Sequence, residues 1–578
     1  MPNNQREPHR WGFRDTRFTL DQDGSVALTG NRYSICGYAM PYFIPFVESL
    51  LKVRLPTEQP IIERAEVQLP EPKRNEAFCA ALALEFPAEQ ISFADAVRLP
   101  HSHGQTTVDE VYQVLYGELP KPVDAVFYCA DTEQAQALVQ LAAEHDVCLL
   151  PYGGGTSVSN ALRVPADERR MVVAVDTGRM NRIISLEHGN MRVTVQAGIC
   201  GADLEQQLRA EGFTLGHEPD SIEFSTVGGW IATNASGMKK NRYGNIEDVV
   251  ESMTVVTPSG TLQEAMRAPR VSAGSRLHHL LFGSEGNFGL VTEAVLKLRP
   301  LPEVTQYQSI LFRDFSTGIA FLQELSKGTI WPASIRLVDN PQFRFAQSLK
   351  PALSGWADYK HRLQRWLLTS VKKFDLETLA AATIVLEGST DEVIAQRRAL
   401  DKLVRRYGAL YGGAENGRRG YQLTYAIAYI RDFLMRYSII GETYETSASW
   451  DCIETICDEV KLAAEREHER YGFQGKPYVS ARVTQIYPTG ACIYFTHGAS
   501  IFGMQDPDRK FHAVEQAMRA VILANGGSLS HHHGIGKLRA PFISQLYSES
   551  TKNALVALKR ELDPGNVFGA GNNLFDRS

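Results

Sequence analysis

The 578-residue chain lacks sequence repeats, biased tracts, long apolar runs and a surplus of either charge. The charge-free stretch 483–505 is broken by Pro488, Gly490 and Gly498, so it does not provide the roughly twenty predominantly apolar residues of a bilayer span. Sixty basic and 66 acidic side chains leave a net charge of −6, far from the basic surplus of a dedicated nucleic-acid binder. These absences exclude collagen-like and disordered chains, and they predict a soluble globular protein with no nucleic-acid partner.

Cysteine spacings typical of metal sites are also missing. The eight cysteines include no Cys-x-x-Cys pair, and in a chain of this length they read as reduced, mostly buried thiols of an intracellular protein. The first residues carry arginines but no apolar core of a secretory signal. The last four residues, Phe-Asp-Arg-Ser, do not match a Ser-Lys-Leu type peroxisomal signal.

Apolar periodicity becomes regular from about Pro122 and alternates between strand and helix patterns. Asp131 and Gln134 form a capping-box pattern before a helix, and Pro258-Ser259-Gly260 predicts a hairpin turn after residues 252–257. Further helices are expected at 203–211, 392–406, 508–525 and 550–562. Strands are expected at 125–129, 147–150, 171–176 and 191–197. The pattern predicts an α+β protein.

Composition and proline positions predict four regions. The aromatic run 33–47 fits a buried N-terminal layer better than a membrane contact. The predicted regions are a partly helical N-terminal region at 1–118, a cofactor-binding domain at 119–301, a substrate or cap domain at 302–520 and a C-terminal segment at 521–578 that carries a histidine loop.

Three clusters of small and hydroxylated residues follow predicted strands. The first, 151–157, has three successive glycines, whose amides are unshielded by Cβ atoms and can cradle a pyrophosphate. It is neither a P-loop nor a Gly-x-Gly-x-x-Gly turn, and alone it fits a flexible loop better. The other clusters lie at 220–237 and 283–289. One ligand with phosphates and a flat ring would explain all three.

These clusters resemble the FAD-binding loops of the flavoprotein superfamily that includes vanillyl-alcohol oxidase and p-cresol methylhydroxylase. The chain is more similar still to the alkyldihydroxyacetonephosphate synthase (alkylglycerone-phosphate synthase) family, from about residue 11 to residue 568. The strings that carry this resemblance include Gly-His-Glu-Pro-Asp at 216–220, Ser-Ile-Arg-Leu at 334–337, Tyr-Ile-Arg-Asp at 429–432, Arg-Val-Thr-Gln at 482–485 and Gly-Ala-Cys-Ile-Tyr-Phe at 490–495. The most specific is Ser-Leu-Ser-His-His-His-Gly at 528–534.

The resemblance implies a two-subdomain PCMH-type FAD-binding domain, an α/β cap domain and helical N- and C-terminal segments. It also implies FAD bound without a covalent link. The family replaces the acyl chain of acyl-dihydroxyacetone phosphate with a long-chain fatty alcohol, releasing a fatty acid through a flavin N5 adduct without net redox change. This step belongs to ether lipid (plasmalogen) biosynthesis. A homodimer, a peripheral membrane surface and a peroxisomal or glycosomal location are further expectations from the family.

By position, the resemblance assigns an acid/base to Tyr494, an essential arginine to Arg336, a substrate-binding arginine to Arg431 and activity-critical histidines to His531, His532 and His533. His217 and Lys239 are weaker candidates for contacts to flavin or phosphate. The expected FAD contacts are Pro151, Tyr152, Gly153, Gly154, Gly155, Thr156, Ser157, Asp220, Ser221, Ile222, Glu223, Phe224, Ser225, Thr226, Thr233, Asn234, Ala235, Ser236, Glu285, Gly286, Asn287, Phe288, Gly289, Leu290 and Val291.

The residue types suit this chemistry, although each also has a structural interpretation. A tyrosine has an ordinary pKa of about 10, so Tyr494 needs a cationic or hydrogen-bonding neighbour to act near neutrality. Arginine forks suit a phosphate and a departing carboxylate. Without the family, Tyr494 reads as a core residue, Arg431 as a surface ion pair and the histidines as a solvated loop. A metal is disfavoured because no carboxylate or cysteine is near the histidines in sequence.

Two other functions remain open at this stage. An oxidoreductase on the same fold would reduce FAD with a 2-hydroxyacid or an alcohol. Those relatives tend to have Glu-His-Gly where this chain has His532-His533-Gly534, which disfavours the oxidoreductase. A flavin-binding protein without catalysis is the third hypothesis. The sequence Thr496-His497-Gly498 departs from the aromatic residues of known relatives and leaves the chain-length preference open.

Overall fold

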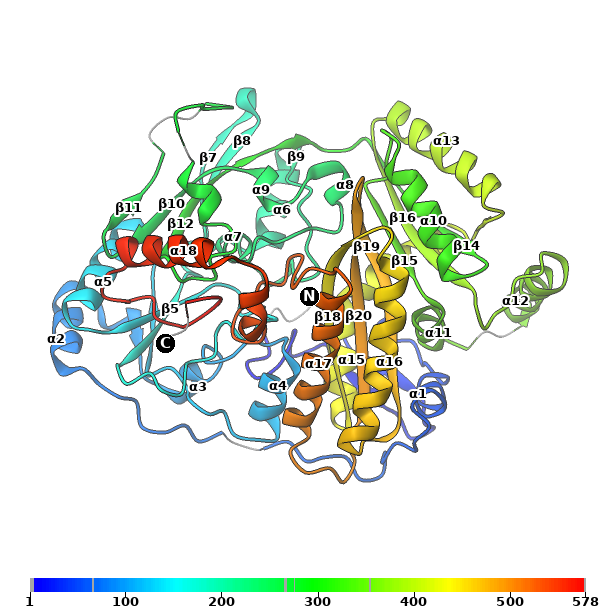
Figure 1. Cartoon of the computed structure of the whole chain (residues 1–578), viewed down its shortest axis with the longest axis horizontal. Helices are drawn as coiled ribbons and strands as arrows, with labels where there is room; N and C mark the ends of the chain where they lie inside the picture. Colours follow the sequence, from blue (N-terminus) through cyan, green and yellow to red (C-terminus); the bar gives the residue numbers. More distant parts are fainter. Residues whose placement is uncertain (1–4, 65–66, 265–267, 275, 353–354, 576–578) are drawn as a thin grey trace. The chain divides into compact units, whose positions relative to one another are not determined.

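The computed structural model describes residues 5–64, 67–264, 268–274, 276–352 and 355–575 (Figure 1). The chain divides into two compact units. Unit 1 comprises Met1–Glu63 and Pro302–His531, and unit 2 comprises Arg64–Leu301 and His532–Ser578. The predicted N-terminal region 1–118 is thus divided between the units at Glu63, and the C-terminal segment at His531.

Unit 2 contains a four-stranded sheet in the order β3-β4-β6-β5, in which β4, β6 and β5 are parallel. Helix α5 (Thr132–Glu144) connects β4 to β5 and buries Ala135, Leu138 and other apolar residues at helical spacing. Asp131 caps this helix by accepting a hydrogen bond from the Gln134 amide at 2.9 Å. The Gln134 side chain accepts instead from the Ala130 amide, so the predicted capping box forms only in part.

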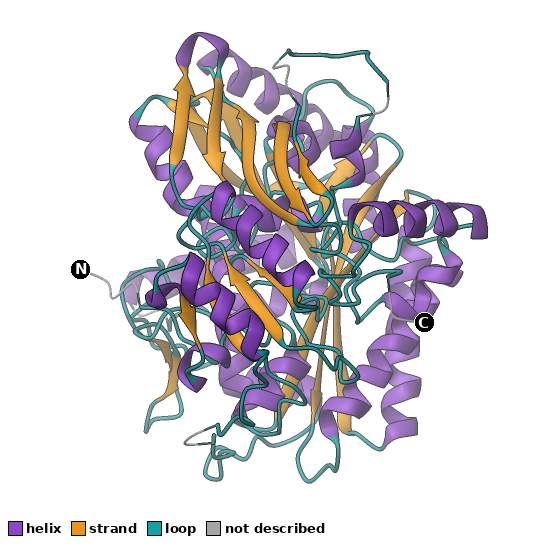
Figure 2. Cartoon of the chain, turned by 90° about the vertical axis from the view of Figure 1, so that its left-hand side faces the viewer, coloured by secondary structure: helices purple, strands orange, loops and turns teal. Residues whose placement is uncertain are grey.

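The second sheet of unit 2 has five antiparallel strands in the order β11-β10-β12-β8-β7 (Figure 2). The predicted hairpin turn is confirmed, because β10 (Val250–Thr257) pairs with β11 (Gly260–Leu262) directly across Pro258 and Ser259. The other long strand, β12 (Leu290–Lys297), begins at the end of the third glycine cluster. Because β12 is the middle strand of the five, this cluster lies at the N-terminal end of the central strand.

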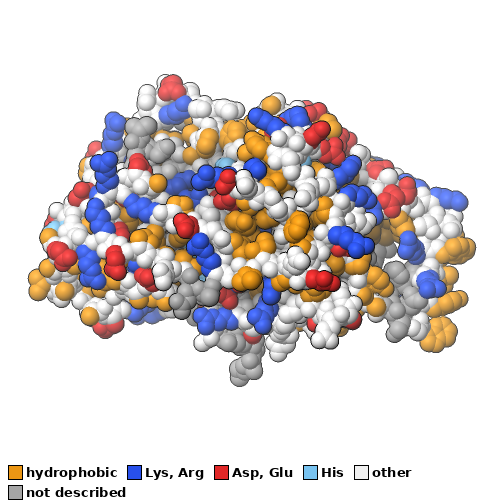
Figure 3. Space-filling view, turned by 90° about the horizontal axis from the view of Figure 1, so that it is seen from below, with side chains coloured by type: hydrophobic (Ala, Val, Ile, Leu, Met, Phe, Trp, Pro, Cys, Tyr) orange, Lys and Arg blue, Asp and Glu red, His pale blue; other side chains and the backbone are white. Residues whose placement is uncertain are grey.

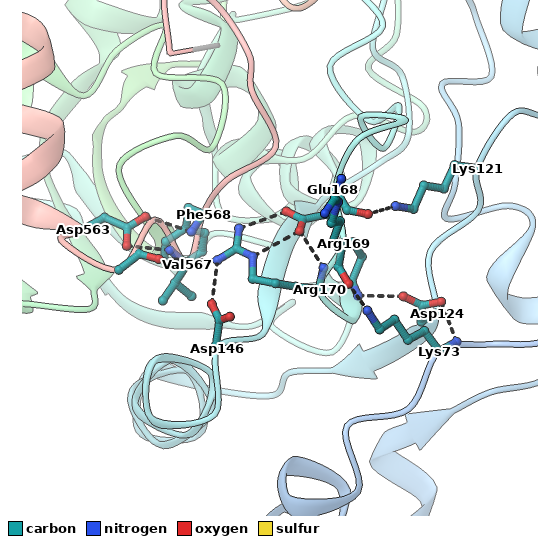
Figure 4. Close-up of polar contacts among 12 residues, drawn as sticks. Lys73, Lys121, Asp124, Asp146, Glu168, Arg169, Arg170, Asp563, Val567 and Phe568 are labelled. Carbon is teal, nitrogen blue, oxygen red and sulfur yellow. Dashed lines mark hydrogen bonds and ion pairs between the residues drawn. The ribbon is translucent and has the colours of Figure 1, made fainter. Parts of the chain in front are cut away.

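The C-terminal tail of unit 2 is fastened by polar contacts (Figure 4). The Asp563 carboxylate accepts hydrogen bonds from the amides of Val567 and Phe568 and pairs with Lys559, which it approaches to 2.6 Å. Arg170 pairs with Glu168 at 2.9 Å and donates to the Gly565 carbonyl. Val567 and Phe568 are buried in the same core as α5 and β4, so the tail is an integral part of this unit.

Unit 1 is built on a seven-stranded antiparallel sheet in the order β17-β14-β16-β15-β19-β20-β18. The three longest strands are β18 (Ile439–Ser449), β19 (Gln474–Tyr487) and β20 (Gly490–Ser500), which lie next to one another. Helices α16 and α17 pack beside these strands in Figure 1. The predicted catalytic tyrosine, Tyr494, lies on β20.

The aromatic N-terminal run 33–47 is only partly buried in unit 1, so the favoured interpretation as a buried layer describes part of it. Helix α1 (Phe43–Leu51) buries Phe43, Ile44 and Val47, whereas Tyr38 and Tyr42 are exposed. Upstream of it, Gly12 has a φ of +100°, and the Tyr429 ring fills the space that a Cβ there would need. The first residues therefore close over helix α15 (Ile427–Met435) of the same unit.

The remaining elements follow the same two-unit division. In unit 1 they are β1 (Phe18–Leu20), β2 (Val26–Leu28), β14 (Val304–Phe312), α10 (Phe315–Ser326), β15 (Ser334–Val338), α11 (Asn340–Ser348), α12 (Gly355–Trp366), the π-helical η4 (Leu367–Val371), β16 (Ala380–Gly388), α13 (Thr390–Arg406), β17 (Leu410–Tyr411), α14 (Ala414–Gln422), η5 (Leu423–Ala426), α16 (Ile453–Tyr471) and α17 (Pro507–Ala524). In unit 2 they are α2 (Glu76–Glu85), η1 (Ala88–Gln90), β3 (Ile91–Ser92), α3 (Asp95–Arg98), α4 (Val108–Leu115), β4 (Ala125–Tyr128), β5 (Cys148–Tyr152), β6 (Val172–Asp176), β7 (Ile183–Glu187), η2 (His188–Asn190), β8 (Arg192–Gln196), α6 (Gly201–Ala210), β9 (Phe213–Thr214), α7 (Val227–Thr233), α8 (Lys240–Tyr243), α9 (Ile246–Val249), η3 (Leu277–Leu280), β13 (Arg299–Pro300), η6 (Ala540–Gln545) and α18 (Glu549–Leu562).

Two expectations about the whole chain can be compared with the structure. In the part of the chain that the structure describes, no helix combines the length and apolar character needed to cross a membrane. All eight cysteines are free, four of them buried and four partly exposed.

Candidate functional site

The first glycine cluster packs directly against the second in unit 2. A Cβ on Gly154 would lie 2.8 Å from the carbonyl carbon of Phe224 and closer still to its oxygen. A Cβ on Gly153 would lie 2.5 Å from the Thr226 hydroxyl. Gly155 has a φ of +65°, which favours glycine. Only glycine therefore allows this loop to lie so close to residues 224–226.

Backbone hydrogen bonds connect the third cluster, 283–289, to the second. The amides of Gly283 and Glu285 donate to the carbonyls of Ile231 and Ala232, at 3.0 and 2.8 Å. A Cβ on Gly286 would lie 3.2 Å from the Pro151 ring. The three loops that the sequence predicts to grip one ligand thus lie side by side in unit 2, although they are far apart in the chain.

The short helix α7 organises the centre of these loops. Thr226 caps it by accepting from the Gly229 amide at 3.2 Å, and Asn234 ends it with a left-handed φ of +51°. Ser225 accepts a hydrogen bond from the Trp230 indole at 2.8 Å, and the Ser236 hydroxyl donates to Asn245 at 2.6 Å. The hydroxyl-rich sequence thus serves partly to fix the loops themselves, in addition to the predicted FAD contacts.

We expect the Gly154→Ala variant to lose most of its bound flavin. The new Cβ would force the first loop away from Phe224, which displaces the amides of the predicted pyrophosphate cradle. The flavin absorbance per polypeptide after gel filtration measures the effect. Gly189→Ala is the matched control, because nothing lies within 4 Å of a Cβ built there. Equal flavin content in both variants would contradict the role of the loop.

The side chain of Glu285, whose FAD contact stays a prediction, accepts hydrogen bonds from the protein itself. The buried carboxylate accepts the Gly536 amide with both oxygens, at 2.8 and 2.9 Å, and the Ser159 hydroxyl at 3.2 Å. Burial raises the pKa of Glu285 above its ordinary value. Glu285 thereby ties the chain that follows the histidines to the first and third loops, a role that sequence reasoning missed.

His217 is the strongest structural sign of a missing ligand in unit 2. Its ring is 2% exposed and packs on Trp230 with 4.8 Å between centroids, yet neither ring nitrogen has a hydrogen-bond partner among the described residues. Burial, aided by the nearby His532, lowers the pKa of His217 to about 3, so the ring is neutral at pH 7. An unpartnered neutral imidazole packed on Trp230, in the helix that Thr226 caps, fits a contact to the polar edge of a bound FAD. Lys239 pairs instead with Glu218 at 3.0 Å.

The predicted acid/base, Tyr494, lies on β20 in unit 1 and is 7% exposed. Its register partners are Glu445 on β18 and Arg482 on β19. The guanidinium carbon of Arg482 lies 4.5 Å from the centre of the Tyr494 ring. Arg482 therefore provides the cationic neighbour that an acid/base tyrosine needs, and the sequence had given no role to it.

Arg336 lies on the same face of the sheet. Val338 is the register partner of Arg482, and Arg336, two residues earlier on β15, points to the same side. Arg336 is 5% exposed and donates to the Thr424 hydroxyl at 2.5 Å. Two buried arginines and a tyrosine thus share one face, an arrangement suited to an anionic substrate.

Glu445 fastens the beginning of the histidine run to this face. It accepts hydrogen bonds from the Ser530 hydroxyl at 2.8 Å and from the His531 amide at 2.5 Å. The Nε2 atom of His531 is 2.6 Å from the Tyr487 hydroxyl. His531 thus has a fixed orientation in unit 1, whereas His532 and His533 belong to unit 2, where their rings are 4.8 Å apart.

The fold also revises the argument against a metal, which rested on neighbours in sequence. A ring nitrogen of His531 and the Sγ atom of Cys492 lie within 4.8 Å of each other in unit 1. Burial raises the pKa of the Cys492 thiol well above its usual range. The thiol lies two residues from Tyr494 and is part of the same face.

Arg431, the predicted substrate arginine, pairs with its neighbour. Its Nε and a terminal nitrogen donate to Asp432 Oδ1 at 2.8 and 2.5 Å, and both residues are buried on α15. Burial raises the pKa of Asp432, and the charge of Arg431 opposes this shift. The ion pair that sequence reasoning considered is present, but it is buried, and substrate binding by Arg431 remains a prediction.

Buried neutral histidines predict acid sensitivity of the fold. In unit 1, His468 and His497 are buried with their Nε2 atoms 2.9 Å apart. Burial lowers the pKa of His468 to about 4 and that of His497 well below its ordinary value. The unfolded chain then binds protons first as pH falls below about 6.5, so the free energy of unfolding should fall by up to about 1.4 kcal/mol per pH unit for each histidine towards pH 4.

Urea unfolding of the full-length protein at several pH values between 7.5 and 4.5 measures how the free energy of unfolding depends on pH. The His468→Gln variant keeps a hydrogen-bonding group but does not titrate, so its slope should be smaller by the share of one histidine. A slope that stays the same in this variant would show that the buried pair does not control the acid sensitivity.

Comparisons with known proteins establish the family of the chain. Residues 123–266 match the family described as FAD binding domain, and residues 301–573 match FAD linked oxidases, C-terminal domain. An alkyldihydroxyacetonephosphate synthase from Caenorhabditis elegans is 40% identical over 566 residues, covering 97% of this chain and 94% of the relative. The Trypanosoma brucei brucei enzyme of the same name is 31% identical and covers 98% and 91%.

Solved structures give the same result. A structure of alkyldihydroxyacetonephosphate synthase matches with a TM-score of 0.85 and 26% identity, covering 100% of this chain and 99% of that one. p-Cresol methylhydroxylase, at a TM-score of 0.64 and 14% identity, shares the fold, as the predicted fold class requires. The chain is an FAD-dependent enzyme and belongs to the alkyldihydroxyacetonephosphate synthase family.

Proposed function

We propose that the protein replaces the acyl chain of 1-acyl-dihydroxyacetone phosphate with a long-chain fatty alcohol. The products are 1-alkyl-dihydroxyacetone phosphate and a fatty acid, so the reaction is an exchange without net redox change. The observation that carries the proposal is the face of unit 1 on which Tyr494 stands beside the buried arginines Arg336 and Arg482. Hydride transfer from a simple alcohol needs no such pair of anion-binding groups.

The residues of this face divide the work of the exchange. Tyr494 removes and returns the proton on the carbon next to the substrate carbonyl, and the positive charge of Arg482 stabilises the phenolate form during that step. Arg336, with Arg431 as the predicted second arginine, holds the phosphate and the departing carboxylate. His531, held by Glu445 and Tyr487, is oriented to exchange a proton with the leaving or entering oxygen.

The three glycine-rich loops and His217 would hold the FAD in unit 2, bound without a covalent link. When bound, the flavin would supply a transient covalent bond between its N5 and the substrate carbon, which accounts for an exchange without reduction. Acid precipitation tests the mode of attachment: free flavin should appear in the supernatant, and flavin in the pellet would show a covalent link.

The activity test uses purified holoenzyme with palmitoyl-dihydroxyacetone phosphate and labelled hexadecanol. Labelled alkyl product together with released palmitate is expected, without consumption of an electron acceptor. Steady bleaching of the flavin by a 2-hydroxyacid, with turnover in the presence of an acceptor and no labelled ether, would favour the oxidoreductase.

Three further proposals come from the family membership. The protein forms a homodimer, contacts a membrane surface peripherally and acts in peroxisomes or glycosomes. Their support is the similarity over nearly the full chain to synthases of the same name. Light scattering of the holoenzyme and imaging of the tagged full chain test the first and the last.

A further inference from the structure

Two basic residues of unit 1, Lys350 and Arg419, lie close together where the end of α11 meets α14. Lys350 follows α11, and its Nζ atom donates to the side-chain oxygen of Asn416 at 3.3 Å. Arg419, on α14, donates to the Leu349 carbonyl at 3.0 Å. Asn416 and Arg419 are three positions apart on α14, so these two bonds bring the ammonium and the guanidinium to the same side of that helix.

The two cations have no acidic counterpart. In the part of the chain that the structure describes, neither forms an ion pair, and Glu415, one turn before Arg419, pairs with Arg418 at 3.1 Å. Burial and the charge of Arg419 lower the pKa of Lys350 to about 8, and burial also lowers the pKa of Arg419. Elsewhere, on the face drawn in Figure 3, basic and acidic side chains are interspersed. A bound anion would stabilise the pair.

Both side chains keep donors for such an anion. An ammonium has three hydrogens and a guanidinium five, and the bonds to Asn416 and Leu349 use one of each. Lys350 and Arg419 are partly exposed, so solvent reaches the pair. A carboxylate or a phosphate, which has several acceptor positions, can accept from both side chains at once.

Helix α14 carries this pair close to the face of the sheet that bears Arg336. A Cβ on Gly420 would lie 2.4 Å from the Thr383 methyl carbon, and Thr383 is the register partner of Arg336. Register partners point to the same side of a sheet, so α14 covers the face on which Arg336 lies. Thr424, which accepts the hydrogen bond from Arg336, follows Arg419 by five residues, a helical rise of about 8 Å.

We propose that Lys350 and Arg419 form a second anion site of unit 1, which takes the carboxylate of the fatty acid released by the exchange. The identity of the anion rests on the proposed function, because that reaction releases a carboxylate beside Arg336. Arg336 has to give up this product before the next substrate enters, and a pair of cations along the same face gives the carboxylate a place to move to. The substrate phosphate has the same acceptor chemistry, and the experiment separates the two.

Calorimetric titration of the full-length holoenzyme with laurate tests the site. The parent should bind laurate, and Arg419→Gln and Lys350→Gln should each weaken this binding at least about tenfold, because each variant loses a charge-assisted hydrogen bond. Arg418→Gln is the matched control: it removes the neighbouring arginine, which is paired with Glu415, and should bind laurate like the parent. Dodecanol, which has the same chain length without the charge, should bind equally to all of them.

The outcomes separate this inference from the proposed function. Equal laurate binding by the parent and both Gln variants would overturn the site, and flavin content shows that each variant is folded. If Arg419→Gln does not fold, Lys350→Gln decides alone. Weaker binding of inorganic phosphate in these variants, with laurate binding unchanged, would overturn the fatty acid as the occupant. Laurate binding that depends on the pair in an enzyme that forms no ether product would leave the site standing and reject the proposed function.

Discussion

Replacing Tyr494 with phenylalanine should lower the rate of alkyl exchange by about 10² to 10⁴-fold, the range typical for loss of a general acid/base. The variant keeps the ring over which the Arg482 guanidinium lies, so packing on this face of the sheet should change little. Only the phenolic oxygen, which we propose to carry the proton, is removed. Single-turnover rates with the labelled alcohol measure the loss, and the flavin absorbance shows that the cofactor site is intact.

Tyr444→Phe is the matched control. Tyr444 lies on the neighbouring strand β18, is fully buried and stacks on Phe495, but its place in the register is beside Glu445 and therefore on the opposite face of the sheet. Its hydroxyl contacts the Met518 sulfur at 3.4 Å. This control should keep nearly full activity. A Tyr494→Phe variant as active as the control would mean that another group moves the proton.

The second large effect is expected from Glu285→Ala. Removing a buried carboxylate that accepts three hydrogen bonds leaves the Gly536 amide and the Ser159 hydroxyl without it, which should cost about 2–4 kcal/mol of stability in unit 2. The first and third glycine-rich loops would also lose their hydrogen-bonded connection to Gly536, in the chain that follows the histidines. We therefore expect lower flavin content as well as an earlier thermal transition.

Two further variants test whether the effect comes from the hydrogen bonds of the Glu285 carboxylate. Glu285→Gln retains a carbonyl oxygen as acceptor, so it should recover part of both properties. Glu293→Ala removes a half-buried carboxylate eight residues further along, which accepts from Thr132 at 3.3 Å, and should leave flavin content unchanged. If Glu285→Ala binds flavin as well as Glu293→Ala does, Glu285 does not position the loops.

The local patterns of the chain were sufficient for much of the fold. The helix after Asp131 and the hairpin at Pro258 form where they were predicted, because caps and turns depend on residues a few positions apart. The glycine clusters could also be found from sequence, since closely packed loops require residues without a Cβ at fixed places. Family resemblance then supplied the cofactor, which no local pattern names.

The candidate site was predicted less completely, and the misses have a common cause. Arg482 and Glu445 were given no role, because their relation to Tyr494 arises from strand register: the three residues come from β19, β18 and β20. Cys492 was left out of the argument about metals for the same reason, since nothing in the sequence around the histidines brings a thiol near them. The internal hydrogen bonds of the Glu285 carboxylate were not foreseen either, because Gly536 lies far away in the chain.

The sequence by itself determined which chemical groups this protein has and which short segments are candidates for nucleotide contacts, because both follow from residue type and near neighbours along the chain. Only the tertiary structure decided which arginine accompanies the tyrosine and which carboxylate secures each side of the histidine run. These outcomes depend on strand pairing and burial between segments up to hundreds of residues apart, and no local spacing encodes them.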